Sequence, residues 1–478
     1  NVAVGTGALK TNTTASNNVA VGNFALRQNT TGANNIAVGS SALLANTTGH
    51  ENIAIGGIAL DANTTGSTLL AIGYNALGAN TTGSDNTAIG YDALAATTTG
   101  AANTAVGEGA LGANTTASYN SAFGENALAA NTTGTALVAL GQACLQANTT
   151  ADDNTGVGYG ALGANTTGTS NVAVGKTALT ANTTAAENTA VGAASMLANT
   201  TGASNAALGT DTLKANTTGA NNTALGAYSL DANTTASNNT AVGLHALGAN
   251  TTGANNVAVG QGSLDANTTA ANNTGLGTQT LSANTTGHSN TAVGYAALEA
   301  NTTASNNTAV GFTALLANTT GSDNVAVGDY ALLANTTAAN NTAVGSDAMI
   351  ANTTGATLTA VGSTALDANT TGSYSTAVGY AALSGNTDGD SNVAVGYNAG
   401  VQVSGGDANT LIGTNAGDVI TTGSNNVIVG VNCGVGSGGV GNAMVMGQAV
   451  TGVGTNNFTF GNGTLDTNIE MGTTTVST

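Results

Sequence analysis

The chain has 478 residues, a formal net charge of −19 and only four lysines and arginines. Nucleic-acid binding requires a basic surface that neutralises phosphates, so this composition excludes it, and it disfavours binding to an anionic membrane surface for the same reason. No run of about eighteen apolar residues is present to span a bilayer. A content of 41% hydrophobic and 6% charged residues argues against disorder.

One seventeen-residue unit fills most of the chain. It reads NVAVGKTALTANTTAAE over residues 171–187 and recurs in unbroken register twenty-three times over residues 1–391. A fixed period of this kind is typical of a solenoid whose coils contact only their neighbours. We therefore predict an all-β fold, a parallel β-solenoid or β-roll of 17-residue coils, about 110 to 125 Å long at roughly 4.8 Å per coil. Because the first residue already opens a repeat, we expect the natural chain to begin earlier.

The first five positions of the unit predict a short strand and a corner. Numbering each coil from 1 to 17, position 5 is Gly in all twenty-three coils, as in Gly175. An invariant glycine indicates a backbone with positive φ or with no room for a Cβ. Positions 2 to 4 then form a strand whose side chains alternate between two faces. Position 4 is always apolar, as in Val174, and we expect it to face the core.

Position 3 suggests contact with another copy of the chain. It is Ala in every one of these coils except at Gly156 and Gly275. One coil encloses only one face of its strand, so we expect this uniformly small face to allow the close approach of a second chain. Ala173, Ala190 and Ala241 are accordingly predicted to lie in a subunit interface.

The rest of the unit separates an inside from an outside. Position 9 is Leu, as in Leu179, or twice Met, and is predicted to fill the core. Asn-Thr-Thr follows at positions 12 to 14, and asparagines such as Asn182 are expected to stack as an inward amide ladder, which would shield this glycosylation sequon. Nearly all charges occur at positions 6, 7, 10, 16 and 17, which we interpret as outward positions.

The C-terminal part changes register. Residues 392–456 continue as degenerate, Gly-rich repeats that we expect to close the solenoid, and residues 457–478 are predicted to be a terminal strand segment. Residues 1–391 form the regular solenoid. Cys144 and Cys433 both occupy position 8, where Ala is usual, and lie seventeen coils apart. We therefore predict two buried free thiols and no disulfide.

The recurring motif N-x-A-V-G resembles the head repeat of trimeric autotransporter adhesins, a repeat class that also occurs in bacteriophage tail fibres. The resemblance implies a left-handed parallel β-roll of three chains that acts as a surface fibre. The segment from Phe460-Gly461-Asn462 to Ser477-Thr478 looks like the stretch that precedes the C-terminal intramolecular chaperone of such tail fibres.

These observations predict a structural and adhesive fibre shaft, a homotrimer that projects from a phage tail or a bacterial cell surface and contributes to attachment to a host or a surface. The expected location is extracellular, and the expected partners are the chain itself and a surface glycan or other receptor. The alternative is an ice-binding solenoid that presents Thr ladders; it requires the threonines of positions 13 and 14 to point outward.

No enzyme, cofactor or metal site is predicted. The three histidines fall at outward positions and no nucleophile is organised around them. The candidate binding residues are instead an exposed aromatic row just past the glycine corner, at position 6: Tyr74, Tyr91, Tyr159, Tyr295, Tyr380 and Tyr397. Such a row could hold sugars; the alternative interpretation is a set of scattered surface aromatic residues without a binding function.

Overall fold

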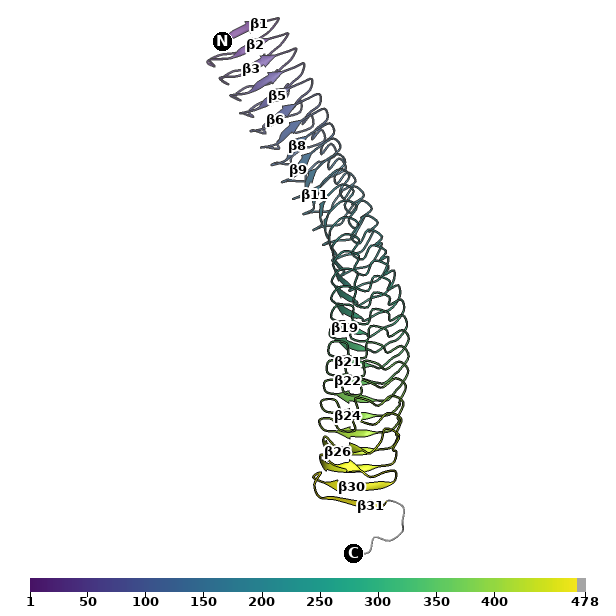
Figure 1. Ribbon diagram of the computed structural model, residues 1–478. Helices are drawn as coiled ribbons and strands as arrows, with labels where there is room; N and C mark the ends of the chain where they lie inside the picture. The colour runs from purple at the N-terminus through teal and green to yellow at the C-terminus, as the bar shows by residue number, and fades with distance from the viewer. Residues whose placement is uncertain (471–478) are drawn as a thin grey trace. The chain divides into compact units, whose positions relative to one another are not determined.

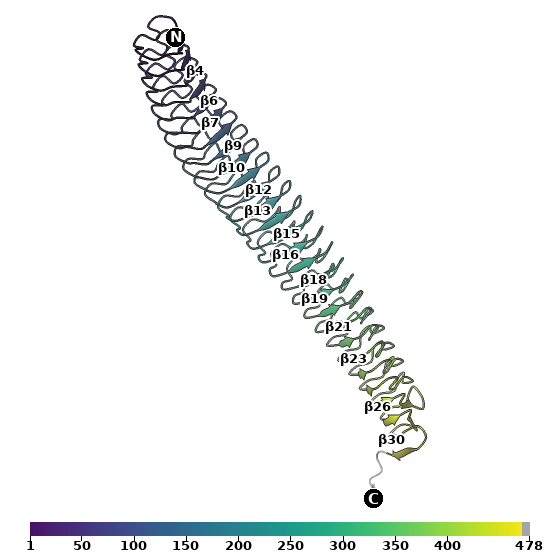
Figure 2. The same ribbon diagram turned by 90° about the vertical axis from the view of Figure 1, so that its left-hand side faces the viewer.

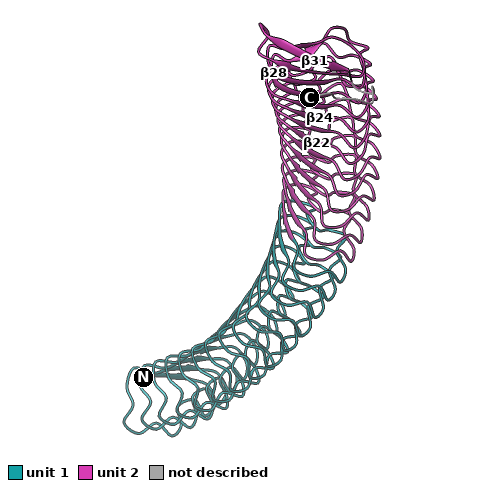
Figure 3. Cartoon of the chain, turned by 90° about the horizontal axis from the view of Figure 1, so that it is seen from below, with its two compact units in different colours: residues 1–239 teal, residues 240–478 magenta. Residues whose placement is uncertain are grey.

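The computed structural model describes residues 1–470, so the last eight residues of the segment predicted at 457–478 lie outside the described part. The chain divides into two compact units, residues 1–239 and 240–478 (Figure 3). Each unit is a parallel β-solenoid in which successive turns of the chain stack on one another (Figures 1 and 2). Together they contain about 27 coils of about 17 residues, and no helix occurs within residues 1–470.

The first unit contributes one three-residue strand per coil. These strands are β1 (Val2–Val4), β2 (Val19–Val21), β3 (Ile36–Val38), β4 (Ile53–Ile55), β5 (Leu70–Ile72), β6 (Thr87–Ile89), β7 (Thr104–Val106), β8 (Ser121–Phe123), β9 (Val138–Leu140), β10 (Thr155–Val157), β11 (Val172–Val174), β12 (Thr189–Val191), β13 (Ala206–Leu208) and β14 (Thr223–Leu225).

The second unit repeats this arrangement and then departs from it near its end. Its strands are β15 (Thr240–Val242), β16 (Val257–Val259), β17 (Thr274–Leu276), β18 (Thr291–Val293), β19 (Thr308–Val310), β20 (Val325–Val327), β21 (Thr342–Val344), β22 (Thr359–Val361), β23 (Thr376–Val378), β24 (Val393–Val395), β25 (Thr410–Ile412), β26 (Val427–Val431), β27 (Gly434–Val435), β28 (Met444–Gln448), β29 (Thr451–Gly452), β30 (Asn457–Gly461) and β31 (Asp466–Glu470).

Neighbouring strands pair in parallel with an offset of one coil. Val172 in β11 lies opposite Thr189 in β12, seventeen residues later. The same offset joins the strands from β1 to β14 in the first unit and from β15 to β26 and β28 in the second. Backbone bonds outside the strands also join the coils: the amide of Leu179 donates to the carbonyl of Ser195 at 3.0 Å. The period of the sequence is therefore the register of the sheet.

The glycine corner has two physical causes. Gly175 adopts a φ of 142°, a conformation that residues with a side chain rarely adopt. In addition, a Cβ on Gly175 would lie 2.3 Å from the carbonyl oxygen of Gly192 in the next coil. Backbone conformation and stacking distance both exclude a side chain, which accounts for the invariance of position 5.

The core is a column of leucines held in an unusual backbone conformation. Leu179 is completely buried and has a φ of 51°. A left-handed conformation costs a residue with a Cβ roughly 1 to 2 kcal/mol. Full burial of a leucine side chain contributes about 1.5 to 3 kcal/mol, which offsets that strain.

Two columns of asparagine reinforce the stack. Asn182 at position 12 donates through Nδ2 to Asn165 Oδ1 of the preceding coil at 2.8 Å and to the carbonyl of Ala185 at 3.0 Å. We call these position-12 asparagines the Asn ladder. At position 1, Asn171 Oδ1 accepts from the amide of Asn188 at 3.0 Å. The Asn side chains thus satisfy buried polar groups that the tight turns leave without strand partners.

The orientation of the strand is the reverse of the one expected from the sequence. Ala173, Ala190 and Ala241 at position 3 have no exposed surface and face the interior of their own coils, whereas Val174 at position 4 is only partly buried. The leucines already fill the narrow interior, so only a methyl group fits on the inward face of the strand. The position-3 alanines therefore have no free surface on which subunits could meet, and the prediction of an alanine interface is corrected.

At the C-terminal end, the second unit finishes with a turn-back. The offset falls from seventeen residues to fourteen between Met444 in β28 and Phe458 in β30. Strand β31 then pairs antiparallel with β30, as in the pairing of Phe460 with Thr467. The pairing of β27 with β29 forms a separate two-stranded ladder in the same region. The coils shorten here, and the last described strand reverses the direction of the chain.

Candidate functional site

The six position-6 tyrosines are exposed, but they do not form one continuous row. Their exposed fractions lie between 50% and 55%. Tyr74 and Tyr91 stack with ring centroids 5.6 Å apart, and Tyr380 and Tyr397 stack at 5.4 Å. Identical positions in adjacent coils lie one strand spacing apart, so two aromatic residues there stack face to face. Tyr159 has no stacked ring partner within residues 1–470.

Tyr295 stands in a different setting from the other tyrosines. Its ring stacks on Phe312 of the following coil at 5.5 Å, and Phe312 in turn meets Tyr330 edge to face at 5.4 Å. On the side of the preceding coils, Tyr295 borders a surface hollow of about 400 Å³. The hollow is lined by His245, Gln261, Gly262, Asp265, Thr278, Gln279 and Tyr295, which together we call the Tyr295 hollow.

A missing side chain creates the Tyr295 hollow. Position 7 carries His245 in the coil before Gly262 and Gln279 in the coil after it. Gly262 has no side chain between them, and a Cβ added there would meet nothing within 4 Å. The neighbouring long side chains therefore form walls around an open floor. The sequence contained the signal, a position-7 glycine between the long side chains of His245 and Gln279, but single-coil reasoning missed it.

The walls of the Tyr295 hollow are polar and partly organised. The hydroxyl of Tyr295 donates to Gln279 Oε1 at 3.3 Å. That bond uses the oxygen of the amide and leaves its NH2 group as a donor. Gln261 contributes a second amide and Asp265 a carboxylate, which only accepts hydrogen bonds when ionised. An aromatic ring, two amides and a carboxylate thus surround one opening.

A second surface carries no charge: position 4 is apolar in every regular coil, and position 2 is either apolar or a Thr or Ser. The side chains at positions 2 and 4 of the strands form what we call the strand face, and no charged residue occurs at these positions from β1 to β28. Leu208 is 48% exposed and Leu225 is 42% exposed. In the first unit these leucines and Val191 line a shallow hollow of about 250 Å³ on this face. Sequence reasoning missed the strand face because it placed position 4 in the core.

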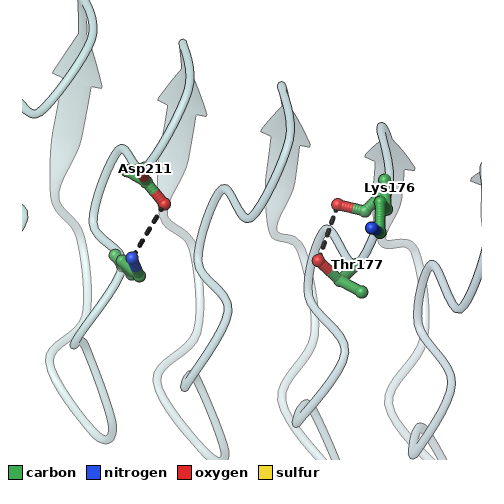
Figure 4. Close-up of polar contacts among 4 residues, drawn as sticks. Lys176, Thr177 and Asp211 are labelled. Atoms are coloured by element: carbon green, nitrogen blue, oxygen red, sulfur yellow. Dashed lines mark hydrogen bonds and ion pairs between the residues drawn. The ribbon is translucent and has the colours of Figure 1, made fainter.

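The charged residues lie elsewhere, on the outer turns. Figure 4 shows Lys176 and Thr177 on the loop that follows β11, and Asp211 on the loop that follows β13. Asp211 forms an ion pair with Lys214 at 3.1 Å, and Thr177 Oγ1 donates to the carbonyl of Lys176 at 2.7 Å. The ammonium side of that ion pair is nearly half exposed, so the pair contributes little stability. No charged residue is fully buried within residues 1–470, although one carboxylate oxygen of Asp367 is buried. The charged side chains therefore lie on the outer turns, and the strand face is neutral.

The two threonines of the Asn-Thr-Thr motif play different parts. At position 13, Thr30 Oγ1 donates to the carbonyl of Thr47 at 2.9 Å, and its side chain is partly buried. Position-14 threonines such as Thr184 are exposed. The motif therefore presents a single file of exposed hydroxyls along each unit rather than the paired array that the ice-binding alternative required of it.

Titratable groups in the described chain are dispersed. His50, His245 and His288 are exposed, and no group of three or more His, Cys, Asp or Glu residues that could hold a metal ion occurs within residues 1–470. Cys144 and Cys433 are free and buried. Burial raises the pKa of the Cys144 thiol to about 12, so the reactive thiolate is scarce at neutral pH.

Comparison with known proteins finds no family model that matches this sequence and no curated protein similar to it. Among the described residues, no helix has the length and apolar character needed to cross a bilayer.

Proposed function

We propose that the chain is the shaft of an extracellular fibre in which copies of the chain pack side by side through their strand faces, and that the fibre contributes to attachment to a host or another surface. The observation that carries this proposal is the strand face itself. It is free of charge, its position-4 side chains are apolar, and it is partly exposed in both units. The fibre belongs to a phage tail or a bacterial surface, as the repeat resemblance implies.

Physical chemistry favours covering this face. Apolar surface removed from water contributes about 25 cal/mol per Å², and single soluble chains rarely expose a contiguous apolar patch larger than a few hundred Å². Here the same apolar positions recur on paired neighbouring strands throughout each unit, including Val21, Leu208 and Val259. A second copy of the chain offers the same period, so coil can meet coil in register.

The number of copies comes from the resemblance, which implies three chains. The net charge of −19 per chain is compatible with that assembly because the charges lie on the outer turns and not on the strand face. Three strand faces brought together bury neutral surface and leave the carboxylates in water. The outer turns then remain available for contact with other molecules.

Light scattering coupled to size-exclusion chromatography tests the proposal. For a chain of 45.3 kDa, we expect a trimer mass of about 136 kDa, three times the chain mass. Replacing Val191, Leu208 and Leu225 together with Glu places charges on the strand face and should yield monomers. The matched control replaces the exposed position-14 threonines of the same coils, Thr201, Thr218 and Thr235, with Glu and should leave the mass unchanged. A soluble monomer of the unmodified chain would contradict the proposal.

Ice binding is the second candidate, and one observation favours it. On the strand face, threonines at position 2 such as Thr291 and Thr308 pair across adjacent strands and repeat at the strand spacing beside apolar residues at position 4, without any charge. A regular neutral array of this kind suits ordered water as well as another subunit. The same surface cannot serve both roles at once. A monomer that shows thermal hysteresis would favour ice binding, and a trimer without it would favour the fibre.

A further inference from the structure

The Tyr295 hollow combines a flat apolar platform with polar side walls. One face of the Tyr295 ring packs on Phe312 in the following coil, whereas the hollow lies over the preceding coils. The stacking contact restrains the plane of the ring, and the long hydrogen bond from its hydroxyl to Gln279 Oε1, at 3.3 Å, orients its tip. A ring held in this way can receive a flat ligand without losing further conformational freedom.

The ligand chemistry follows from the lining. An aromatic platform favours a ligand with an apolar face, and the amides of Gln261 and Gln279 favour ligand groups that donate and accept hydrogen bonds at its edge. The Asp265 carboxylate requires donors, which ligand hydroxyl groups supply. A pyranose sugar has this combination, with C–H bonds on its faces and hydroxyl groups around its rim.

The volume and the charge of the hollow narrow the class of ligand further. Ligand sites in proteins have volumes of about 300 to 1,000 Å³, and the hollow of about 400 Å³ lies at the small end of that range. The hollow contains a carboxylate and the chain carries a net charge of −19, so an anionic sugar would be repelled. Uncharged sugars carry no such penalty.

The other exposed tyrosines provide a contrast within the same fold. Tyr397 occupies the same coil position as Tyr295, is 52% exposed, and stacks on Tyr380 at 5.4 Å. Two coils before Tyr397, at the position that Gly262 occupies relative to Tyr295, position 7 carries Thr364, so no glycine opens the floor beside it. Stacked exposed tyrosines are therefore a recurrent feature of this surface, and the hollow at Gly262 distinguishes Tyr295.

We propose that the Tyr295 hollow is a binding site for an uncharged pyranose saccharide, with Tyr295 as the stacking platform and with Gln261, Gln279 and Asp265 as hydrogen-bonding groups. The proposal rests on the attachment role proposed above, for which it names the ligand class. The site lies within the second unit and is complete within one chain.

Two variants disable the site in different ways. Tyr295→Ala removes the platform. Gly262→Gln fills the floor, and the fold should accept it because position 7 already holds Gln279 at a φ of 58°, close to the 63° of Gly262. The matched controls are Tyr397→Ala, an exposed stacked tyrosine without the hollow, and Gly160→Gln, the same substitution at a position-7 glycine with a φ of 63° in the first unit.

The experiment screens the full chain against a glycan array and measures affinity by titration calorimetry with cellotriose, mannotriose, chitotriose and lactose, with sialyllactose as the anionic probe. We expect at least one uncharged probe to bind, and its Kd to weaken about tenfold or more in Tyr295→Ala and Gly262→Gln but not in the two controls. Absence of binding to every uncharged glycan would overturn the proposal, as would binding that both site variants retain.

Oligomeric mass, measured on the same samples, separates this inference from the proposed function. A trimer that binds no uncharged saccharide refutes the saccharide site and leaves the fibre proposal standing. A monomer whose binding depends on Tyr295 and Gly262 supports the site and removes the fibre assembly.

Discussion

Cys144 and Gly156 are complementary exceptions to the repeat. Cys144 replaces the usual Ala at position 8, and Gly156 replaces the usual Ala at position 3 of the next coil. A Cβ added to Gly156 would lie 2.4 Å from Cys144 Sγ. The other glycine at position 3, Gly275, faces the enlarged position-8 residue Ser263, whose Oγ would lie 2.5 Å from an added Cβ. Both glycines therefore leave room for a larger side chain opposite.

This relationship predicts a coupled pair of substitutions. Gly156→Ala should destabilise the surrounding coils by about 1 to 3 kcal/mol, because the interior is fully packed. The double variant with Cys144→Ala has Ala at position 8 and Ala at position 3 of the next coil, as most other coils do. It should recover most of the lost stability. Hydrogen exchange across residues 137–170 measures the effect locally, which suits a repeat array whose unfolding need not be two-state. Additive effects of the two substitutions would show that the side chains do not compete for space.

The Asn ladder contains one internal defect, which leads to a second prediction. Thr97 stands where the other regular coils have Asn, and Asn80 Oδ1 in the preceding coil is buried without a hydrogen-bond partner. Thr97→Asn should supply the missing donor and stabilise the first unit by about 1 to 3 kcal/mol, the cost of an unsatisfied buried polar group.

The opposite substitution provides the control for the ladder. Asn182→Thr would remove the donor to Asn165 Oδ1, which now receives a bond of 2.8 Å. Its melting temperature should fall, while that of Thr97→Asn rises. If both substitutions shift stability in the same direction, the hydrogen-bonding account of the ladder is wrong.

Much of the fold follows from the sequence because one physical rule repeats in every coil. The seventeen-residue period gives the pairing of Val172 with Thr189, and the invariant glycine gives the corner at Gly175. The period does not determine which side-chain face of the three-residue strand points into the coil. Alternation shows only that Ala173 and Val174 lie on opposite sides, and the volume left by Leu179 decides which one is inside.

The candidate site was less predictable for a related reason. The tyrosines at position 6 could be identified from a single coil, and their exposure follows from that position. The Tyr295 hollow, however, depends on residues from four successive coils and on the missing side chain of Gly262. A pattern shared by all coils cannot indicate a feature that exists because a few coils depart from it.

The inside and outside of the coil can be tested with one substitution on each side. Leu213→Asp places an unpaired carboxylate among completely buried side chains and should cost several kcal/mol. Ala227→Asp adds the same group at position 6, where acidic residues already occur in other coils, and should be nearly silent. Thermal unfolding of the two variants decides the point, and equal melting temperatures would contradict the assigned orientation.

Asp367 makes the stability of the second unit depend on pH. Its Oδ1 is buried without a hydrogen-bond partner, and burial raises the pKa of this carboxyl above its ordinary 3.8, with the nearby charge of Asp347 acting in the same direction. The folded state thus holds the proton more tightly than the unfolded state. The resulting stability is fully present below pH 3.8 and is lost as the pH rises through the raised pKa.

Asp367→Asn tests this assignment because it imitates the protonated carboxyl at every pH. Relative to the unmodified chain, we expect the melting temperature of Asp367→Asn to be higher at pH 6 to 7 and the difference to shrink as the pH falls toward 3.8. Asp153→Asn, at an exposed position, provides the control and should follow the unmodified chain throughout. A melting-temperature difference for Asp367→Asn that stays constant from pH 3 to pH 7 would show that the effect arises from packing and not from the ionisation of Asp367.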